Sequence, residues 1–255
     1  MVRRGHPTSR YVHPRAGRNT DHDHGLEMAD ESSPNYHRWI TELCRPYVGK
    51  RALEVGAGHG AVTRFLSEGV TDYVATDTSL ECLTALEARF RESSNVTVHE
   101  LDVRTGQPDG DFDTIVMINV LEHLLDDAGT LTSLSRHLAP DGKLIIYVPA
   151  LNSLYGAWDD RVGHYRRYSK RQLEHVMRDA GLAVVDSRWA NLVAIPAWFA
   201  FSRLGIRNKQ SGPNATLGRD LQIWDKTAVP MTRWLETRVR PPIGLNVLGV
   251  AMRRD

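Results

Sequence analysis

Short apolar segments alternate with segments of helical periodicity along most of this chain, and this alternation restricts the fold more than any other feature. It predicts an α/β protein with a mostly parallel sheet and helices on both faces. The expected strands span 51–55, 72–77, 96–102, 112–119, 143–149 and 182–190, and the expected helices begin at 35 or span 61–68, 79–92, 123–138 and 170–180. The helix from Asn35 has Pro34 at its first position and Ser33 as a candidate cap.

Residues 191–240 do not fit a strand–helix unit. They begin with an apolar stretch, continue through a polar loop and end in a helical pattern around Pro230. The segment 244–254 then reads as one more strand, and a strand that arrives without a crossover helix can enter the sheet antiparallel. We therefore expect an N-terminal tail (1–31), a core (32–190), a helical insert (191–240) and a final core strand (241–255).

Composition excludes several classes of protein. The 255 residues are 41% hydrophobic and 25% charged, which is ordinary for a globular protein with a sizeable core. Two cysteines exclude a disulfide scaffold and a cysteine-rich zinc fold. No apolar run reaches ~18 residues, so no transmembrane segment is expected. Residues 1–31 lack the apolar stretch of a secretory signal, so we expect a mobile tail and a cytoplasmic enzyme.

Charge is distributed unevenly although the formal net charge is only +1. Residues 32–160 contain 10 basic and 19 acidic residues, whereas residues 161–255 contain 17 basic and 7 acidic residues. One interpretation is that these charges lie on solvated faces and partly cancel in space. The other is that the basic C-terminal region meets an acidic substrate or partner.

A glycine-rich turn follows the first expected strand. Gly56, Gly58 and Gly60 let the backbone turn sharply and approach a ligand at a helix N-terminus. The spacing over 56–61 also fits the dinucleotide fingerprint. Asp77 ends the next strand about twenty residues later, where a carboxylate can bind both ribose hydroxyls. These residues fit either a nicotinamide dinucleotide or S-adenosylmethionine.

Three further features favour S-adenosylmethionine. Glu54 precedes the turn, and its negative charge suits a sulfonium and an ammonium group but would repel a pyrophosphate. Asp102 follows the third strand, where it can accept the adenine amino group while Val103 donates its backbone N–H. The fourth strand leads into 119–124, where the substrate pocket is expected to open.

Five motifs occur in an order and spacing that resemble a known family: LEVGAGHG, VATDTS, ELDV, FDTIVMINVLEHL and DGKLIIYVP. The chain resembles class I S-adenosylmethionine-dependent methyltransferases of the small-molecule type over roughly 35–190 plus the terminal strand. This resemblance implies a Rossmann-like seven-stranded sheet with an antiparallel last strand. The segment 152–182 is similar to a bacterial subgroup often encoded beside glycosyltransferases. The implied acceptor is a small molecule in biosynthesis, such as a natural product, a sugar or a lipid-linked glycan, methylated on oxygen or nitrogen.

The resemblance and the residue patterns together assign the cofactor-binding residues by the part of S-adenosylmethionine they contact. The methionine portion is expected at the glycine-rich turn, the ribose at the second strand and the adenine at the third. The expected residues are Tyr36, Glu54, Gly56, Ala57, Gly58 and Asn119 for the methionine portion, Asp77 and Thr78 for the ribose, and Asp102 and Val103 for the adenine.

Methyl transfer from a sulfonium is an in-line displacement, so the site needs alignment and a base for the acceptor proton. His123 and His164 are the candidate bases, with His164 slightly favoured because it lies on a loop that can reach the acceptor. The alternative for His123 is packing against the cofactor.

The polar and aromatic cluster 163–169 supplies two further candidate catalytic residues. Tyr168 can donate or stack, and Arg167 can clamp a carboxylate or phosphate. The alternative is that the adjacent arginines pair with Asp159 and Asp160 on a surface loop.

A metal site is not expected. Glu122, His123, Asp126 and Asp127 form a carboxylate and imidazole set near the pocket. The two aspartates are equally well explained as the first turn of the next helix, where its dipole favours them.

Other functions remain open at this point: a nicotinamide-dependent oxidoreductase, or a methyltransferase-like scaffold without catalysis. A nucleic-acid acceptor is not expected, because no Asn-Pro-Pro-Tyr motif follows the fourth strand and no Pro-Cys pair occurs. The acceptor is expected to be acidic or partly apolar. The apolar start of the insert, with Trp198, Phe199 and Phe201, is expected to face the pocket or a second copy in a homodimer.

Overall fold

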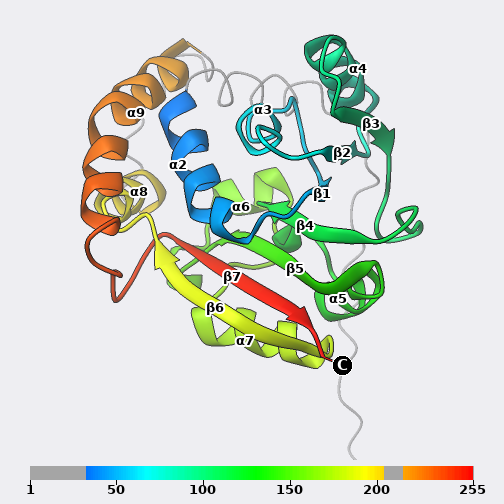
Figure 1. The fold of residues 1–255 in the computed structure, drawn as a ribbon. Coiled ribbons are helices and arrows are strands. Elements are labelled where there is room, and N and C mark those ends of the chain that lie inside the picture. Colours follow the sequence, from blue (N-terminus) through cyan, green and yellow to red (C-terminus); the bar gives the residue numbers. More distant parts are fainter. Residues whose placement is uncertain (1–32, 204–214, 255) are drawn as a thin grey trace, which may run out of the picture.

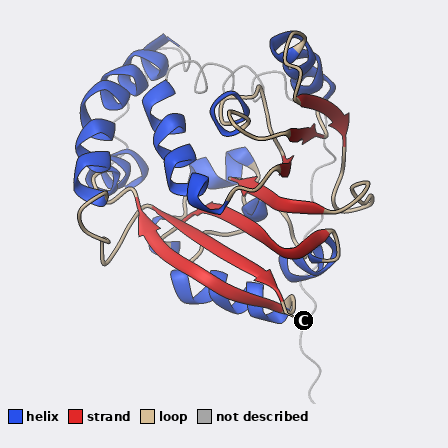
Figure 2. Ribbon diagram, viewed as in Figure 1, coloured by secondary structure: helices blue, strands red, loops and turns tan. Residues whose placement is uncertain are grey.

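The computed structural model describes residues 33–203 and 215–254, which form a central sheet with helices on both faces (Figures 1 and 2). The tail expected over 1–31 and part of the loop expected within the insert lie outside the described residues. None of the described helices combines the length and apolar character needed to cross a membrane.

The sheet has seven strands in the order β3-β2-β1-β4-β5-β7-β6. Strand β7 is antiparallel to both of its neighbours, and the other neighbouring pairs are parallel. The strands are β1 (Arg51–Val55), β2 (Asp72–Asp77), β3 (Val96–Glu100), β4 (Phe112–Ile118), β5 (Leu138–Pro149), β6 (Leu182–Ala190) and β7 (Asn246–Arg253). This confirms the expected seven-stranded sheet with an antiparallel last strand.

The strand order reverses between β1 and β4, because the chain builds outward from β1 to β3 and then returns to the other side of β1. Ligands of open α/β sheets bind at such a reversal, outside the carboxyl ends of the strands. The glycine-rich turn after β1 and the segment after β4 therefore meet where a ligand site is expected.

Helices cover the two faces of the sheet and bury the two larger hydrophobic clusters of the described residues. Trp39, Leu86 and Val229 belong to the cluster under α2, α4 and α9, whereas Leu131 and Leu173 belong to the cluster under α5 and α7. The helices are α2 (Pro34–Cys44), α3 (Thr63–Leu66), α4 (Leu80–Phe90), α5 (Asp127–Ser135), α6 (Ala157–Val162), α7 (Lys170–Asp179), α8 (Ala194–Arg203) and α9 (Ala215–Glu236).

The observed boundaries differ from the expected ones mainly around α5 and β5. The expected helix over 123–138 begins only at Asp127, because Leu121–His123 form a 3-10 turn and Asp126 caps α5 by accepting from the Gly129 N–H at 3.0 Å. The turn expected at 140–142 lies inside β5, where Asp141 has a positive φ of 63°. Helix α6 lies in a segment expected to be a loop.

The described part of the insert is helical, and α9 packs beside α2 at the edge of the molecule (Figure 1). The Trp224 ring lies 5.1 Å from the Tyr36 ring, and the Arg233 side chain pairs with Glu42 at 2.7 Å. A homodimer through this insert stays a prediction.

The N-terminus of α2 is capped by the insert and not by Ser33, whose side chain makes no capping hydrogen bond. The buried Asp225 carboxylate accepts from the backbone N–H groups of Asn35 at 3.1 Å and Tyr36 at 2.8 Å. The sequence expectation for Ser33 was wrong because the better acceptor comes from a helix 190 residues away. Asp225 therefore ties α9 to the start of α2.

We expect Asp225→Ala to lower the free energy of unfolding by ~1–2 kcal/mol, since two N–H donors at a helix N-terminus lose a charged acceptor. Urea unfolding followed by circular dichroism measures this loss. Gln222→Ala, an exposed change one turn earlier on α9, is the matched control. Equal midpoints for the two variants would show that the cap contributes nothing.

Candidate functional site

The glycine-rich turn after β1 passes tightly against the segment that follows β4. Gly56 has a φ of +70°, and a Cβ added there would lie 2.6 Å from Cγ2 of Val120. The Ala57 N–H donates to the Thr76 carbonyl at 2.8 Å. A side chain at position 56 would force these segments apart. Glycine at this position therefore allows the turn and the segment after β4 to pack closely.

Asp77 ends β2 beside this turn. One carboxylate oxygen accepts from the Gly58 N–H at 2.9 Å, and the other accepts from the N–H groups of Thr78 at 2.8 Å and Ser79 at 2.9 Å. A carboxylate has about four lone-pair sites, so beyond these three hydrogen bonds it can still accept from a ligand hydroxyl. The structure thus brings Gly58, Asp77 and Thr78 together as expected.

The carboxyl group of Glu54 lies beneath the turn, in the core. It is 2% exposed, and one oxygen accepts from the Thr63 hydroxyl at 2.6 Å and the Tyr73 hydroxyl at 2.8 Å. The period-two alternation of β1 explains this, because Ala52 and Glu54 share the face that packs under α2. Glu54 therefore supports the turn from below.

Asp102 lies two residues beyond the end of β3 and is paired with Arg104, a partner that the sequence reading missed. The Arg104 guanidinium donates to both carboxylate oxygens, at 2.8 and 2.6 Å. This hydrogen bonding holds the pKa of Asp102 below its ordinary value, although partial burial opposes the shift. Val103 packs against the hydrophobic cluster on the α5 side.

Two further expected residues, Asn119 and Tyr36, both contact Tyr147 of β5. Asn119 follows β4 with a φ of 54°, and its N–H donates to the Tyr147 carbonyl at 2.7 Å. The Tyr36 hydroxyl lies 3.3 Å from the Tyr147 hydroxyl, and burial raises the pKa of Tyr36 to about 12, against the opposing effect of that hydrogen bond. Both residues thus contact β5, which adjoins the switch point.

His123 and His164, 41 positions apart, meet just beyond Asn119. Their rings lie 4.7 Å apart in an edge-on arrangement. His164 Nδ1 lies 2.8 Å from Asp159 Oδ1, and its Nε2 lies 3.8 Å from Glu122 Oε1. The Tyr165 N–H donates to the Glu122 carbonyl at 2.8 Å, which ties the two segments together.

Glu122 is fully buried beside these imidazoles. Burial raises its pKa to about 8, with a nearby Arg167 charge acting in the opposite direction. Neither carboxylate oxygen accepts a hydrogen bond from another residue in the described ranges. Asp126 and Asp127 were also possible metal ligands by sequence alone. In the structure Asp126 caps α5, and Asp127 binds Arg166 at 2.6 Å.

Arg167 and Tyr168, expected to act on the substrate, are buried structural partners. Arg167 is 3% exposed and donates from Nε to Asp159 at 2.8 Å, while its guanidinium stacks 4.7 Å from the Trp198 ring. The Tyr168 hydroxyl donates to Asp127 at 2.8 Å. Hydrogen bonds from His164 and Arg167 hold the pKa of Asp159 below its ordinary value despite burial. The two side chains therefore position their neighbours.

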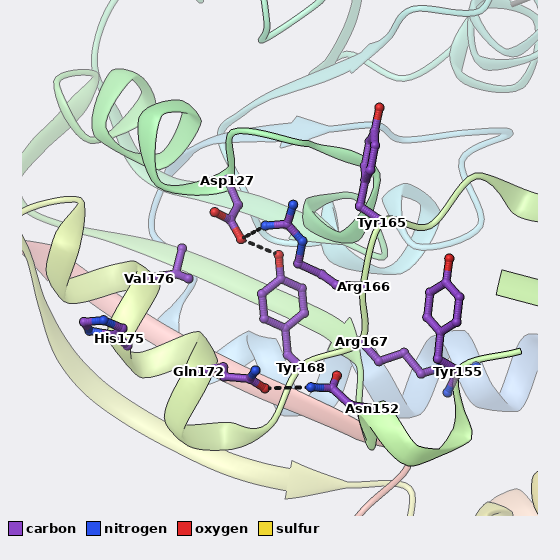
Figure 3. Close-up of a pocket in the computed structure, with 10 residues that line it drawn as sticks. All are labelled: Asp127, Asn152, Tyr155, Tyr165, Arg166, Arg167, Tyr168, Gln172, His175 and Val176. Carbon is purple, nitrogen blue, oxygen red and sulfur yellow. Dashed lines mark hydrogen bonds and ion pairs between the residues drawn. The ribbon is translucent and has the colours of Figure 1, made fainter. Parts of the chain in front are cut away.

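A cavity of about 460 Å³ opens beside the loop 163–169 (Figure 3). Arg166 and Tyr168 both point toward Asp127 within it, and Tyr155 and Tyr165 line it near His164. The Tyr155 hydroxyl lies 2.7 Å from the His164 carbonyl and donates to it. The lining residues are Asp127, Asn152, Tyr155, Tyr165, Arg166, Arg167, Tyr168, Gln172, His175 and Val176.

Comparisons with known proteins show which family and fold the chain shares. A family model described as a methyltransferase domain matches residues 28–187. The chain is 31% identical over 98 residues to the ubiquinone biosynthesis O-methyltransferase of Methylococcus capsulatus. That match covers 37% of this chain and 41% of the relative, so it spans less than half of either protein.

Solved structures with low sequence identity share the fold. A chain in a complex with the Trm112 methyltransferase activator of Haloferax volcanii aligns over 92% of this chain and 95% of its own length, with a TM-score of 0.60 and 17% identity. The N-methyltransferase NodS of Bradyrhizobium japonicum, in complex with S-adenosylhomocysteine, aligns over 92% and 86% with a TM-score of 0.52 and 15% identity.

Proposed function

The chain belongs to the methyltransferase-domain family of class I S-adenosylmethionine-dependent enzymes, and we propose that it methylates a small-molecule acceptor at oxygen or nitrogen. The observation that carries this proposal is the position of Asp77. Its carboxylate lies at the carboxyl end of β2, bonded to the N–H of Gly58 in the turn after β1. A ribose bound there would lie at the switch point of the sheet.

The residues around the turn fit the cofactor. Gly56, Ala57 and Gly58 allow the backbone to approach the methionine portion, and beyond its three backbone hydrogen bonds the Asp77 carboxylate keeps a lone pair that can accept from a ribose hydroxyl. Asp102, with its pKa held low, stays ionised to accept the adenine amino group. S-adenosylmethionine, when bound, supplies a methyl group already activated on a sulfonium.

The acceptor side is assigned to the histidine pair and the tyrosines beside it. His164 is oriented by Asp159, so its imidazole has a fixed direction for proton transfer. Tyr155 and Tyr165 give the adjacent cavity aromatic faces that suit a ring-bearing acceptor. An O-methylation reaction agrees with the name of the ubiquinone biosynthesis relative. The proposed acceptor classes are a natural product, a sugar or a lipid-linked glycan.

Acceptor-dependent release of S-adenosylhomocysteine tests this function. The purified chain is incubated with S-adenosylmethionine and phenolic, sugar and amine acceptors in turn. We expect product above background with at least one hydroxyl or amine class. A protein that binds S-adenosylhomocysteine but transfers no methyl group to any class would instead be a binding scaffold.

We expect Asp77→Ala to weaken S-adenosylhomocysteine binding by about 2 kcal/mol, or ~30-fold, because the ribose loses a charged acceptor. Isothermal titration calorimetry measures the affinity. Asp72→Ala is the matched control, since Asp72 begins the same strand and pairs with Arg51 at an exposed position. Unchanged affinity for the position 77 variant would overturn the ribose assignment.

A further inference from the structure

The cluster formed by Glu122, His123 and His164 has the composition and spacing of a metal site. Each residue offers one ligand atom, and the three atoms lie within 4.8 Å of one another. Glu122 and His123 come from the 3-10 turn after β4, and His164 comes from the loop after α6. The tertiary fold therefore assembles the set.

Glu122 supplies an independent sign that a ligand belongs there. Its side chain is 0% exposed, and its oxygens receive no hydrogen bond from another residue in the ranges the structure describes. A buried carboxyl group that accepts no hydrogen bond is costly, because the hydrogen bonds to water that it loses are not replaced. A cation between Glu122 and the two imidazoles removes this cost.

The surroundings of His164 match those of a metal-binding histidine. Its Nδ1 bonds to Asp159 at 2.8 Å, which leaves Nε2 directed toward Glu122 at 3.8 Å. Histidines that ligate metals commonly hold a carboxylate with the other ring nitrogen, which fixes the ring and raises its basicity. Asp159 is itself fixed by Arg167 at 2.8 Å and by the Gly156 N–H at 3.0 Å.

The local charges also favour a cation. Arg167 pairs directly with Asp159 at 2.8 Å, so its charge, which also acts on Glu122, is shared between two carboxylates. Two imidazoles and one carboxylate suit zinc and related first-row divalent ions better than magnesium or calcium, which prefer oxygen ligands. Three protein ligands leave one position open, as in catalytic zinc sites.

We propose that Glu122, His123 and His164 bind one divalent transition-metal ion of the zinc type, with one coordination position open to the acceptor. The binding itself does not depend on the proposed methyl transfer. The role toward the acceptor rests on that function: the ion lowers the pKa of a coordinated hydroxyl. The proton leaves to solvent, and the oxygen forms a bond to the methyl carbon as the C–S electron pair stays on sulfur. This narrows the acceptor to a hydroxyl compound.

The test is calorimetric titration of Zn²⁺ into the full chain after removal of metal by a chelator, without cofactor or acceptor. We expect one equivalent to bind. Glu122→Gln and His164→Ala should each weaken binding at least ~10-fold, since even an outer partner of a ligand is worth ~10–100-fold. Circular dichroism verifies that each variant is folded.

The N-terminal tail contains His22 and His24, which could bind Zn²⁺ adventitiously. A double variant with both replaced by alanine is therefore the matched control and should keep the single equivalent. The proposal is overturned when the folded wild-type chain takes up no Zn²⁺, when the tail variant alone abolishes uptake, or when folded Glu122→Gln and His164→Ala bind as tightly as wild type. S-adenosylhomocysteine binding, measured separately, reports on the methyltransferase function.

Discussion

His164→Ala is expected to lower turnover by ~10²–10⁴-fold while leaving cofactor affinity nearly unchanged. The imidazole is not among the residues proposed to bind the cofactor, and Asp159 fixes its orientation through a contact of 2.8 Å. Loss of either a base or a metal ligand removes activation of the acceptor, so the rate of the chemical step falls. Steady-state kinetics with a responsive acceptor, together with calorimetry of S-adenosylhomocysteine, separates the rate from the affinity.

His123→Ala is expected to lower turnover by a similar factor, because the His123 ring lies 4.7 Å from the His164 ring. His137→Ala is the control: this partly exposed histidine directly precedes the first residue of β5, and it bonds to Gln107 at 2.8 Å. Full turnover in both site variants would mean that neither histidine activates the acceptor and that alignment alone drives the reaction.

Arg167→Met is expected to lower the free energy of unfolding by ~3–5 kcal/mol, because it leaves Asp159 buried without its cation. The side chains of both partners are almost fully buried, and the Arg167 guanidinium also stacks on Trp198 in α8. Urea unfolding at neutral pH measures the loss. A residue that only clamps substrate would instead raise KM and leave the unfolding midpoint unchanged.

Arg166→Met is the comparison for this variant. Arg166 is adjacent in sequence and also pairs with an aspartate, Asp127, but its side chain is 31% exposed. Partly solvated pairs contribute less, so we expect a smaller loss than at position 167. Equal losses, or no loss in either variant, would contradict the assignment of Arg167 as a buried positioning residue.

The order of strands and helices was predictable from sequence because apolar periodicity records burial directly. The run of β4 and the antiparallel entry of β7 both follow from local patterns. The start of β5 and the short helix α6 did not follow. Pro140 and Gly142 read as a turn in isolation, but they lie in an irregularity within β5, between the paired positions Leu138 and Lys143. Asp225 as the cap of α2 depends on a contact between distant segments.

The site divides in the same way. The glycine-rich turn and Asp77 were predictable because the glycines lie close together in sequence and Asp77 directly ends an apolar segment. The depth of Glu54 and the pairing of Asp102 with Arg104 required the fold. The meeting of Glu122 with His164 also required it, since the only local sign is the density of polar side chains on each segment. The sequence predicts that Arg167 clamps the substrate, but in the fold its side chain is buried and donates to Asp159, so we assign it a positioning role.

Calorimetric titration of the wild-type chain with S-adenosylhomocysteine and, separately, with NADH tests the central claim most directly. The glycine spacing and Asp77 alone fit either ligand, so the two titrations distinguish a methyltransferase from a nicotinamide-dependent enzyme. We expect one equivalent of S-adenosylhomocysteine to bind, with affinity reduced in Asp77→Ala, and no binding of NADH. Binding of NADH that depends on Asp77, with no binding of S-adenosylhomocysteine, would contradict the account.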